Sequence, residues 1–162
     1  MRNIRSERGA IVIEMALLLP FILLLIMMIV EFGFALHTGI SVNNAASEAA
    51  RYAAVSNPSD PACAPGSIEY RAMQTGTGNL LCSEITVLYQ DEGGFPNQIE
   101  RGDGVAVFIQ HEYQTFTPVG GLLNIVSGGT IPATFILGAC SDSRLEQSPS
   151  GGVVTIGQSC NP

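Results

Sequence analysis

The organisation of this chain follows from one stretch near its N-terminus, AIVIEMALLLPFILLLIMMIV, residues 10–30. The stretch contains one charged residue, Glu14, and one proline, Pro20. As a helix, these 21 residues would span about 31 Å, which is roughly the thickness of a bilayer core. A core helix of a soluble protein would show a polar face, whereas this run is apolar on all sides. The stretch therefore predicts a transmembrane helix over about residues 10–32.

The residues that immediately flank this run carry positive charge on one side only. Arg2, Arg5 and Arg8 precede it, and the next basic residue is Arg51. An excess of positive charge before the run predicts a cytoplasmic N-terminus and an exported remainder. A removed signal peptide is a poorer interpretation, because such peptides have about 7–15 apolar residues and an A-x-A site directly after them. We expect a single-pass anchor with residues 1–9 as a basic cytoplasmic leader.

The composition narrows the class of protein. The 162 residues are 46% apolar and 13% charged, whereas soluble proteins are roughly 25% charged. Seven arginines oppose fourteen acidic residues, which gives a net charge of −7 and excludes nucleic-acid binding, since that requires a basic surface. His37 and His111 are isolated in the sequence, and no nucleophile–base pair, phosphate loop or metal motif is present. We expect neither an enzyme nor a bound cofactor or metal.

All four cysteines follow the apolar run: Cys63, Cys82, Cys140 and Cys160. An even number on the exported side predicts disulfides formed in an oxidising compartment. Three pairings are possible, of which the sequential one, Cys63–Cys82 and Cys140–Cys160, closes two loops of similar size. A zinc site is disfavoured, because the sequence has no C-x-x-C pair and neither histidine is close to a cysteine.

The N-terminal helix is expected to continue past the membrane to about residue 56. No proline interrupts residues 31–55, and Asn57-Pro58 then disfavours helical backbone. Alanines in this part recur at i, i+4 spacing in two adjacent stripes, which allows close approach by another helix or by a sheet. The stripe residues are Ala45, Ala46, Ala49, Ala50, Ala53 and Ala54.

Residues 57–162 are expected to form a small α+β head with an antiparallel sheet. Ser67 predicts the cap of a short helix from Ile68 to about Thr75. Runs rich in β-branched and aromatic residues predict strands over 84–90, 105–116, 131–140 and 152–157. Glycine pairs are interpreted as turns between the strands, among them Gly93-Gly94, Gly120-Gly121, Gly128-Gly129 and Gly151-Gly152.

Glu14 requires an explanation, because a carboxylate inside an apolar membrane segment is costly. One interpretation is that it lies shallow enough to reach the headgroups. The other starts from Gly9, directly after Arg8. Cleavage after Gly9 would give Ala10 a free ammonium one helical turn from Glu14 and supply the missing cation. A basic leader, a glycine and a glutamate five places later are typical of type IV prepilins, and we favour this second interpretation.

Residues 8–54 resemble the TadE-like family of tight-adherence pilus proteins. Members open with R-G, a glutamate and A-L-x-L-P, followed by an acidic-aromatic-glycine exit and a form of A-A-R-x-A-A. The corresponding elements here are Arg8-Gly9, Glu14, Ala16-Leu17-Leu18-Leu19-Pro20, Glu31-Phe32-Gly33 and Ala49-Ala50-Arg51-Tyr52-Ala53-Ala54. Ala10 and Met15 depart from the aromatic residues common near this point in other pilins.

The resemblance implies a minor pilin or pseudopilin of a tight-adherence (Flp-type) pilus, held in the bacterial inner membrane with a periplasmic head. Its implied partners are the major Flp-type pilin, other TadE-like minor pilins, the inner-membrane assembly platform and a prepilin peptidase. The implied mechanism is helix packing against other pilins, through the apolar run and the alanine stripes. The alternative is a membrane-anchored periplasmic or surface binding module that enters no filament.

Six positions are candidates for helix packing, and several have a simpler reading. Pro20 is either a kink used in packing or a tolerated proline. Glu31 either meets headgroups or contacts another subunit. Arg51 either pairs with Glu48 on its own helix, the favoured reading, or with an acidic neighbouring subunit. The full set is Pro20, Glu31, Gly33, Ala46, Ala50 and Arg51.

Overall fold

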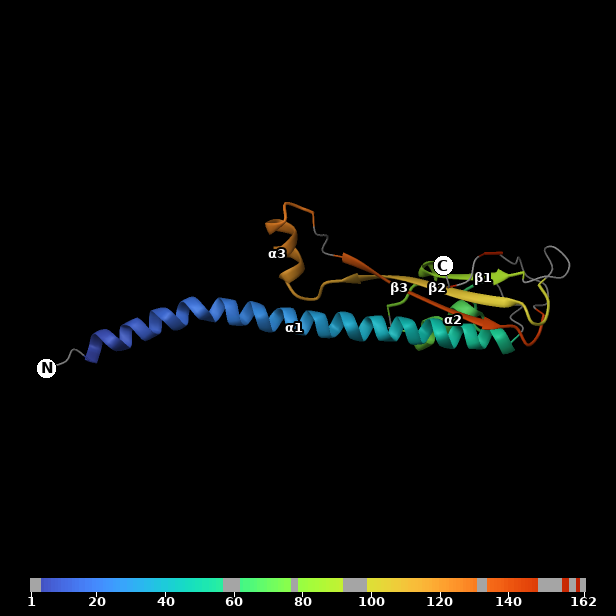
Figure 1. Cartoon of the computed structure of the whole chain (residues 1–162), viewed down its shortest axis with the longest axis horizontal. Coiled ribbons are helices and arrows are strands. Elements are labelled where there is room, and N and C mark those ends of the chain that lie inside the picture. The colour runs from blue at the N-terminus through green and yellow to red at the C-terminus, as the bar shows by residue number, and fades with distance from the viewer. Residues whose placement is uncertain are drawn as a thin grey trace. The chain divides into compact units, whose positions relative to one another are not determined.

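The computed structural model describes residues 4–56, 62–76, 79–91, 99–130, 134–148, 156–157 and 160. Helix α1 (Ile4–Val55) is 52 residues long and continues through Pro20 (Figure 1). It begins before the predicted residue 10, because residues 4–9 contain no proline and are mostly compatible with a helix. Its last turn closes where the Ser56 amide donates to the Tyr52 carbonyl at 2.9 Å. The predicted stop at Asn57-Pro58 lies outside the described residues.

The chain divides into two compact units, which we describe separately. The N-terminal unit comprises Met1–Ala35 and Gln114–Thr134, and the head comprises Leu36–Tyr113 and Phe135–Pro162. The head therefore takes in the last part of α1, whereas the predicted boundary was residue 57. The segment 114–134, predicted as part of the head, groups instead with the apolar half of α1.

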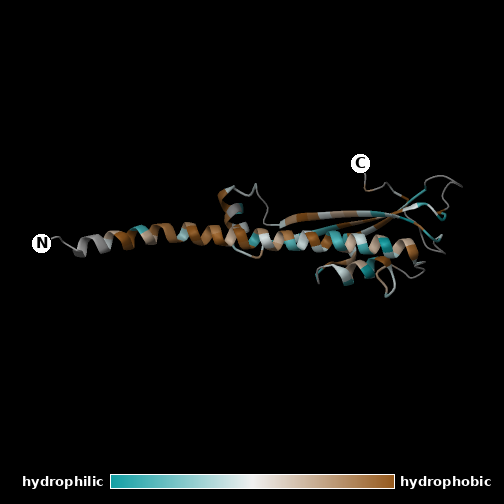
Figure 2. Ribbon diagram, turned by 60° about the horizontal axis from the view of Figure 1, so that its bottom comes forward, coloured by the Kyte–Doolittle hydropathy of each residue, from teal (hydrophilic) through white to brown (hydrophobic). Residues whose placement is uncertain are grey.

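Residues 10–30 of α1 form a long apolar stretch. Figure 2 shows α1 mostly in hydrophobic colours after its first turns, and hydrophilic colours become frequent in its later turns. By length and composition it is long and apolar enough to cross a membrane. The predicted transmembrane segment is thus a continuous helix whose composition suits a bilayer.

The head contains a three-stranded sheet with the order β1-β2-β3. The strands are β1 (Ile85–Gln90), β2 (Gly104–Gln114) and β3 (Thr134–Arg144), close to three of the predicted runs. β1 and β2 are antiparallel, in a register from Ile85 opposite Ile109 to Gln90 opposite Gly104. The fold class is α+β, as predicted.

The fourth predicted strand, residues 152–157, lies mostly outside the described residues. Of its end, Ile156 forms an isolated parallel bridge with Tyr89, and the Gly157 amide donates to the Tyr89 carbonyl at 3.0 Å. The predicted turns at Gly93-Gly94 and Gly151-Gly152 also lie outside the described residues.

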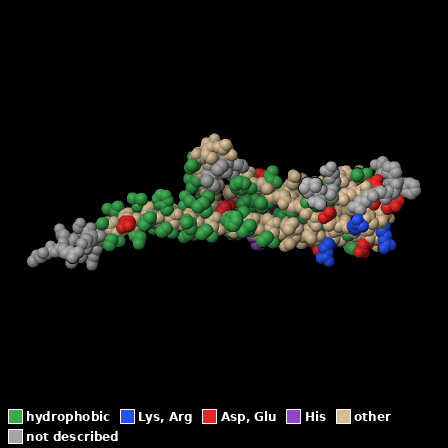
Figure 3. Space-filling view, in the orientation of Figure 1, with side chains coloured by type: hydrophobic (Ala, Val, Ile, Leu, Met, Phe, Trp, Pro, Cys, Tyr) green, Lys and Arg blue, Asp and Glu red, His purple; other side chains and the backbone are tan. Residues whose placement is uncertain are grey.

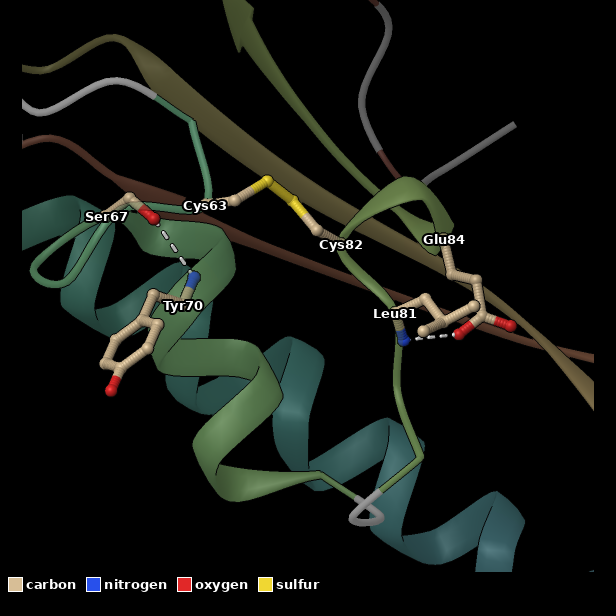
Figure 4. Close-up of a disulfide and its surroundings, with 6 residues drawn as sticks. All are labelled: Cys63, Ser67, Tyr70, Leu81, Cys82 and Glu84. Atoms are coloured by element: carbon tan, nitrogen blue, oxygen red, sulfur yellow. Dashed lines mark hydrogen bonds between the residues drawn. A yellow bond between two sulfur atoms is a disulfide. The ribbon is translucent and has the colours of Figure 1, made fainter.

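Helix α2 (Ile68–Thr75) has the predicted bounds and the predicted cap. The Ser67 hydroxyl accepts a hydrogen bond from the Tyr70 amide at 3.1 Å, as Figure 4 shows. Gly76 ends the helix, and its amide donates to the Ala72 carbonyl. A short 3-10 helix, η1 (Cys82–Glu84), then leads directly into β1.

The core of the head lies between α1, α2 and the sheet. Most of its α1 contribution is alanine, whereas the strands contribute larger β-branched side chains such as Val105, Val107 and Ile109, all fully buried. Small residues on one side and large ones on the other allow helix and sheet to approach closely. The helical members of the core are Val42, Ala45, Ala46, Ala49, Ala50, Ala53, Ile68 and Ala72.

The N-terminal unit contains a helix that the sequence did not predict. Helix α3 (Val119–Val126) includes Gly120-Gly121, which was interpreted as a turn, and that prediction is wrong. Two glycines lower helix propensity by about 1 kcal/mol each, so this helix depends on contacts distant in the sequence. The predicted turn at Gly128-Gly129 is present: both residues have positive φ, and their amides donate to carbonyls at the end of α3.

Candidate functional site

The apolar run of α1 is the largest exposed apolar surface among the described residues. None of its most apolar 18-residue window is buried. Figure 3 shows hydrophobic side chains crowding around this part of the chain, while most arginine and acidic side chains in that view lie over the head. An exposed helix that is apolar on all sides requires lipid or other apolar helices around it.

The three predicted processing residues lie together on this helix. Gly9, Ala10 and Glu14 are exposed residues of α1, so the bond between Gly9 and Ala10 lies inside the helix rather than before it. A side chain at Gly9 would meet nothing within 4 Å. Any requirement for glycine here therefore comes from outside the chain, such as the fit to a peptidase, and not from internal packing.

Glu31 is held by a segment 85 residues later in the sequence. Its carboxylate accepts hydrogen bonds from the Phe116 amide at 3.0 Å, the Thr117 amide at 2.8 Å and the Thr117 hydroxyl at 2.6 Å. The Phe34 ring also contacts the Phe116 ring, with centroids 5.5 Å apart. Neither sequence interpretation of Glu31 included this intramolecular role, because nothing local in the sequence indicates the partner.

Pro20 and Gly33, two further candidates for packing, face open surroundings. Both are exposed residues of α1, and a side chain at Gly33 would meet nothing within 4 Å. The surface of α1 around both residues is therefore accessible, and neither residue shapes a contact inside the chain.

The alanine stripes are occupied by the chain itself. Ala46 and Ala50 have no exposed surface and belong to the core between α1, α2 and the sheet. The sequence left open whether a helix or a sheet would approach these stripes, and in the head both do. In this arrangement the stripes present no surface to another subunit.

Arg51 and Glu48 do not form the predicted pair. Glu48 accepts a hydrogen bond at 2.8 Å from Arg71 of α2, whose guanidinium carbon lies 6.0 Å from the centre of the Tyr52 ring. The Arg71 hydrogen bond lowers the pKa of the Glu48 carboxyl, and the nearby charge of Arg51 adds to this effect. Glu48 pairs with Arg71 because α2 packs against α1 and brings the Arg71 side chain to Glu48.

The carboxylate of Glu84, at the end of η1, accepts hydrogen bonds that link η1 to β2. It accepts from the Leu81 amide at 2.8 Å and the Glu112 amide at 3.1 Å, and it contacts Nδ1 of His111 at 3.1 Å. Burial raises the pKa of the Glu84 carboxyl, but the hydrogen bonds from Leu81, His111 and Glu112 outweigh it and leave that pKa below its ordinary value of 4.5. His111 is thus a structural partner of Glu84.

Glu84→Gln is expected to lower the free energy of unfolding of the head by about 1–3 kcal/mol, because hydrogen bonds to a charged group are lost. The lowered pKa means that Glu84 contributes fully above the ordinary value of 4.5 and loses its contribution as pH falls through its folded value. The difference between wild type and variant should therefore shrink in acid. Urea unfolding at pH 7 and at pH 3.5 measures it.

Glu112→Gln is the matched control for this change. It removes the same charge from an exposed neighbour that contacts Glu84 only through its backbone amide. Equal effects of the two variants at pH 7 would contradict a specific role for the Glu84 carboxylate.

The cysteines form two disulfides in the sequential pairing. Cys63 joins Cys82 and Cys140 joins Cys160, with Cα atoms 6.0 and 5.6 Å apart. The first bond connects the segment before α2 to the start of η1 and so encloses α2 in its loop (Figure 4). Cys63 itself has φ +68°, a conformation unusual for a residue other than glycine.

The described part of the head contains few features that would bind a metal ion or a small molecule. Within the described residues, no three His, Cys, Asp or Glu side chains are grouped so as to hold a metal ion. A surface depression beside Glu84 is lined by Ser83, Thr86, Phe108 and Gln110. Both Glu84 oxygens are already engaged by the chain, so this depression presents no free carboxylate.

Comparison with known proteins shows a similarity in the N-terminal part of the chain. Residues 9–51 match the family model described as TadE-like protein. The matched segment contains the exposed apolar run, Glu14, Glu31 and the first two pairs of stripe alanines. No curated protein and no solved structure gives a significant match to the chain.

Proposed function

We propose that this chain, which is TadE-like over residues 9–51, is a minor pilin or pseudopilin of a tight-adherence (Flp-type) pilus. The observation that supports this most is the exposed apolar helix within the TadE-like segment, with one carboxylate near its start. Such a helix suits a subunit stored in a membrane and able to pack against similar helices. The role is structural rather than catalytic.

In this proposal the apolar run is the assembly surface. The stripe alanines are buried by the head, so contacts with other pilins would use the run from residue 10 to residue 30 instead. The partners would be the major Flp-type pilin, other TadE-like minor pilins, the inner-membrane assembly platform and a prepilin peptidase. The N-terminus would be cytoplasmic and the head periplasmic, because the arginines of the leader precede the run.

The carboxylate of Glu14 provides an electrostatic contribution to the proposed assembly. A carboxylate in the apolar run is costly in lipid and gains from a cation. Cleavage after Gly9 would create an α-ammonium at Ala10, four residues before Glu14 and on the same side of the helix. That ammonium could neutralise Glu14 of its own chain or of a neighbouring pilin, which would favour association of helices.

The mature N-terminus tests the proposal against a permanent membrane anchor. In cells that produce the pilus, we expect Ala10 as the first residue, with a change in net charge from −7 to −9 because three arginines and Glu7 leave. Gly9→Leu should leave the precursor uncut, since a bulky residue would not fit the peptidase. N-terminal sequencing and intact mass measure both.

Ser6→Leu is the control, because it places the same leucine side chain in the leader, three residues before Gly9. It should be processed normally. A wild-type chain that keeps Met1 in pilus-producing cells would favour the anchored binding module, and normal processing of Gly9→Leu would rule out this site.

A further inference from the structure

The segment that carries α3 has an unusual composition for a surface segment. Residues 114–134 contain no Asp, Glu, Lys, Arg or His, although the chain has 21 Asp, Glu, Lys and Arg residues in total. Its polar residues are neutral, mainly Thr, Ser, Asn and Gln. An uncharged segment can enter the outer part of the acyl region without the cost that a full charge would meet there.

Helix α3 turns an apolar face away from the protein. Leu122, Ile125 and Val126 are 49%, 76% and 83% exposed, and their spacing of three and four residues puts them on one side. The opposite side is closed at Gly120, where an added side chain would collide with Thr115. Val119, at the start of α3, is buried although it lies on the same side as Leu122, so the exposed face begins one turn into the helix.

The base of this segment is attached where the apolar run of α1 ends. Glu31 directly follows the run and accepts the hydrogen bonds from Phe116 and Thr117, while Phe34 packs on Phe116. Glu31 lies 17 residues after Glu14, about 26 Å along a helix, which is close to the thickness of a bilayer core. A helix that crosses a membrane through this run would hold Glu31, and with it residues 116–117, at the membrane surface.

We propose that α3 is an interfacial membrane anchor, with its exposed apolar face inserted in the same bilayer that α1 crosses. The occupant of this face is lipid. The face belongs to the same compact unit as the apolar run of α1, and it carries no charge to pair with a protein partner. Glu31 attaches residues 116 and 117, which precede α3, to the point where α1 leaves the bilayer. The three donors from residues 116 and 117 also stabilise the Glu31 carboxylate at the edge of the acyl region.

As a consequence, the chain contacts the membrane at two places, through α1 and through α3. α1 fixes depth, and α3 limits rotation of the N-terminal unit about the axis of α1. The inference rests on the proposed insertion of α1 in a bilayer but not on a role in a pilus.

Tryptophan fluorescence tests this inference directly, because the chain contains no tryptophan. The full chain is reconstituted in phosphatidylcholine nanodiscs with and without bromine on the acyl chains, which quench nearby tryptophan. Ile125→Trp and Phe116→Trp are the reporters, and Phe116→Trp exchanges one exposed aromatic ring for another. Since interfacial helices bury their apolar face about 5–10 Å deep, we expect each reporter to lose about half of its emission or more.

Two matched variants define the scale. Leu24→Trp, on the apolar run, should be quenched strongly, and Leu81→Trp, at a position of the head that is 60% exposed, should not. If the reporters at positions 116 and 125 behave like Leu81→Trp while Leu24→Trp is quenched, the anchor is overturned and α3 lies in water or against protein. An unquenched Leu24→Trp would also overturn the anchor, because it would show that α1 is not in the bilayer. This outcome is independent of cleavage after Gly9, which tests the proposed role in a pilus.

Discussion

Replacing Ala46 and Ala50 together with leucine should strongly destabilise the head. Both side chains are fully buried in the core between α1, α2 and the sheet. Extra methylene groups in a close-packed core cost about 1–3 kcal/mol per site, so the pair should cost about 2–6 kcal/mol. A small domain has only about 5–15 kcal/mol of stability in total. Thermal unfolding of the detergent-solubilised full chain, followed by near-ultraviolet circular dichroism, measures the loss.

Ser47→Leu is the control for this pair of substitutions. Ser47 lies between the two alanines on the same helix but is exposed, so an added leucine should change stability by less than about 0.5 kcal/mol. A double leucine variant that melts like wild type but fails to join other pilins would contradict the prediction. It would show that the stripes serve assembly and not the head.

Local patterns in the sequence predicted most of the regular elements. The apolar run and the alanine-rich segment without proline predicted one long helix, and α1 is continuous over both. Ser67 and Gly76 mark the two ends of α2, because capping depends on residues adjacent in the sequence. The three described strands were found by their β-branched and aromatic residues, with ends in error by up to four residues.

Helix α3 could not be predicted in this way, because its stability does not reside in its own residues. Gly120-Gly121 favours a turn locally, whereas the structure attaches the residues just before α3 to Glu31, 85 and 86 residues away in the sequence. The same limit explains the wrong partner for Glu48. A neighbour at i+3 was visible in the sequence, and Arg71, 23 residues away, was not.

The residues of the candidate site also differ in whether their partners are near or distant in the sequence. Gly9, Ala10, Glu14 and the apolar run were identified from spacing alone, since their proposed chemistry involves residues within two turns of one helix. Glu31 acquires its role from donors 85 and 86 residues away. Two of the partners of Glu84, His111 and the Glu112 amide, are 27 and 28 residues away. Sequence reasoning did mark Glu31 as unusual, because it ends the apolar run, but could not identify what it binds.

The disulfides should map as Cys63–Cys82 and Cys140–Cys160, and tryptic digestion can separate all three possible pairings. The chain has no lysine, and Arg51, Arg71, Arg101 and Arg144 place each cysteine in a different tryptic peptide. Non-reducing mass spectrometry should find peptide 52–71 joined to 72–101, and peptide 102–144 joined to 145–162. Any other linkage, or four free thiols in protein from intact cells, would contradict the pairing.

The two bonds should stabilise the head by similar amounts but protect different parts of it. They span 19 and 20 residues, and loops of that size correspond to about 3 kcal/mol each through restriction of the unfolded chain. Cys63→Ser with Cys82→Ser releases the loop that contains α2, so hydrogen exchange should rise in α2 and in the part of α1 that it covers. Cys140→Ser with Cys160→Ser is the matched control, since it costs about the same energy but should raise exchange first in β3. If both double variants lost protection uniformly across the head, the disulfides would act only through global stability, and the specific hold of Cys63–Cys82 on α2 would be wrong.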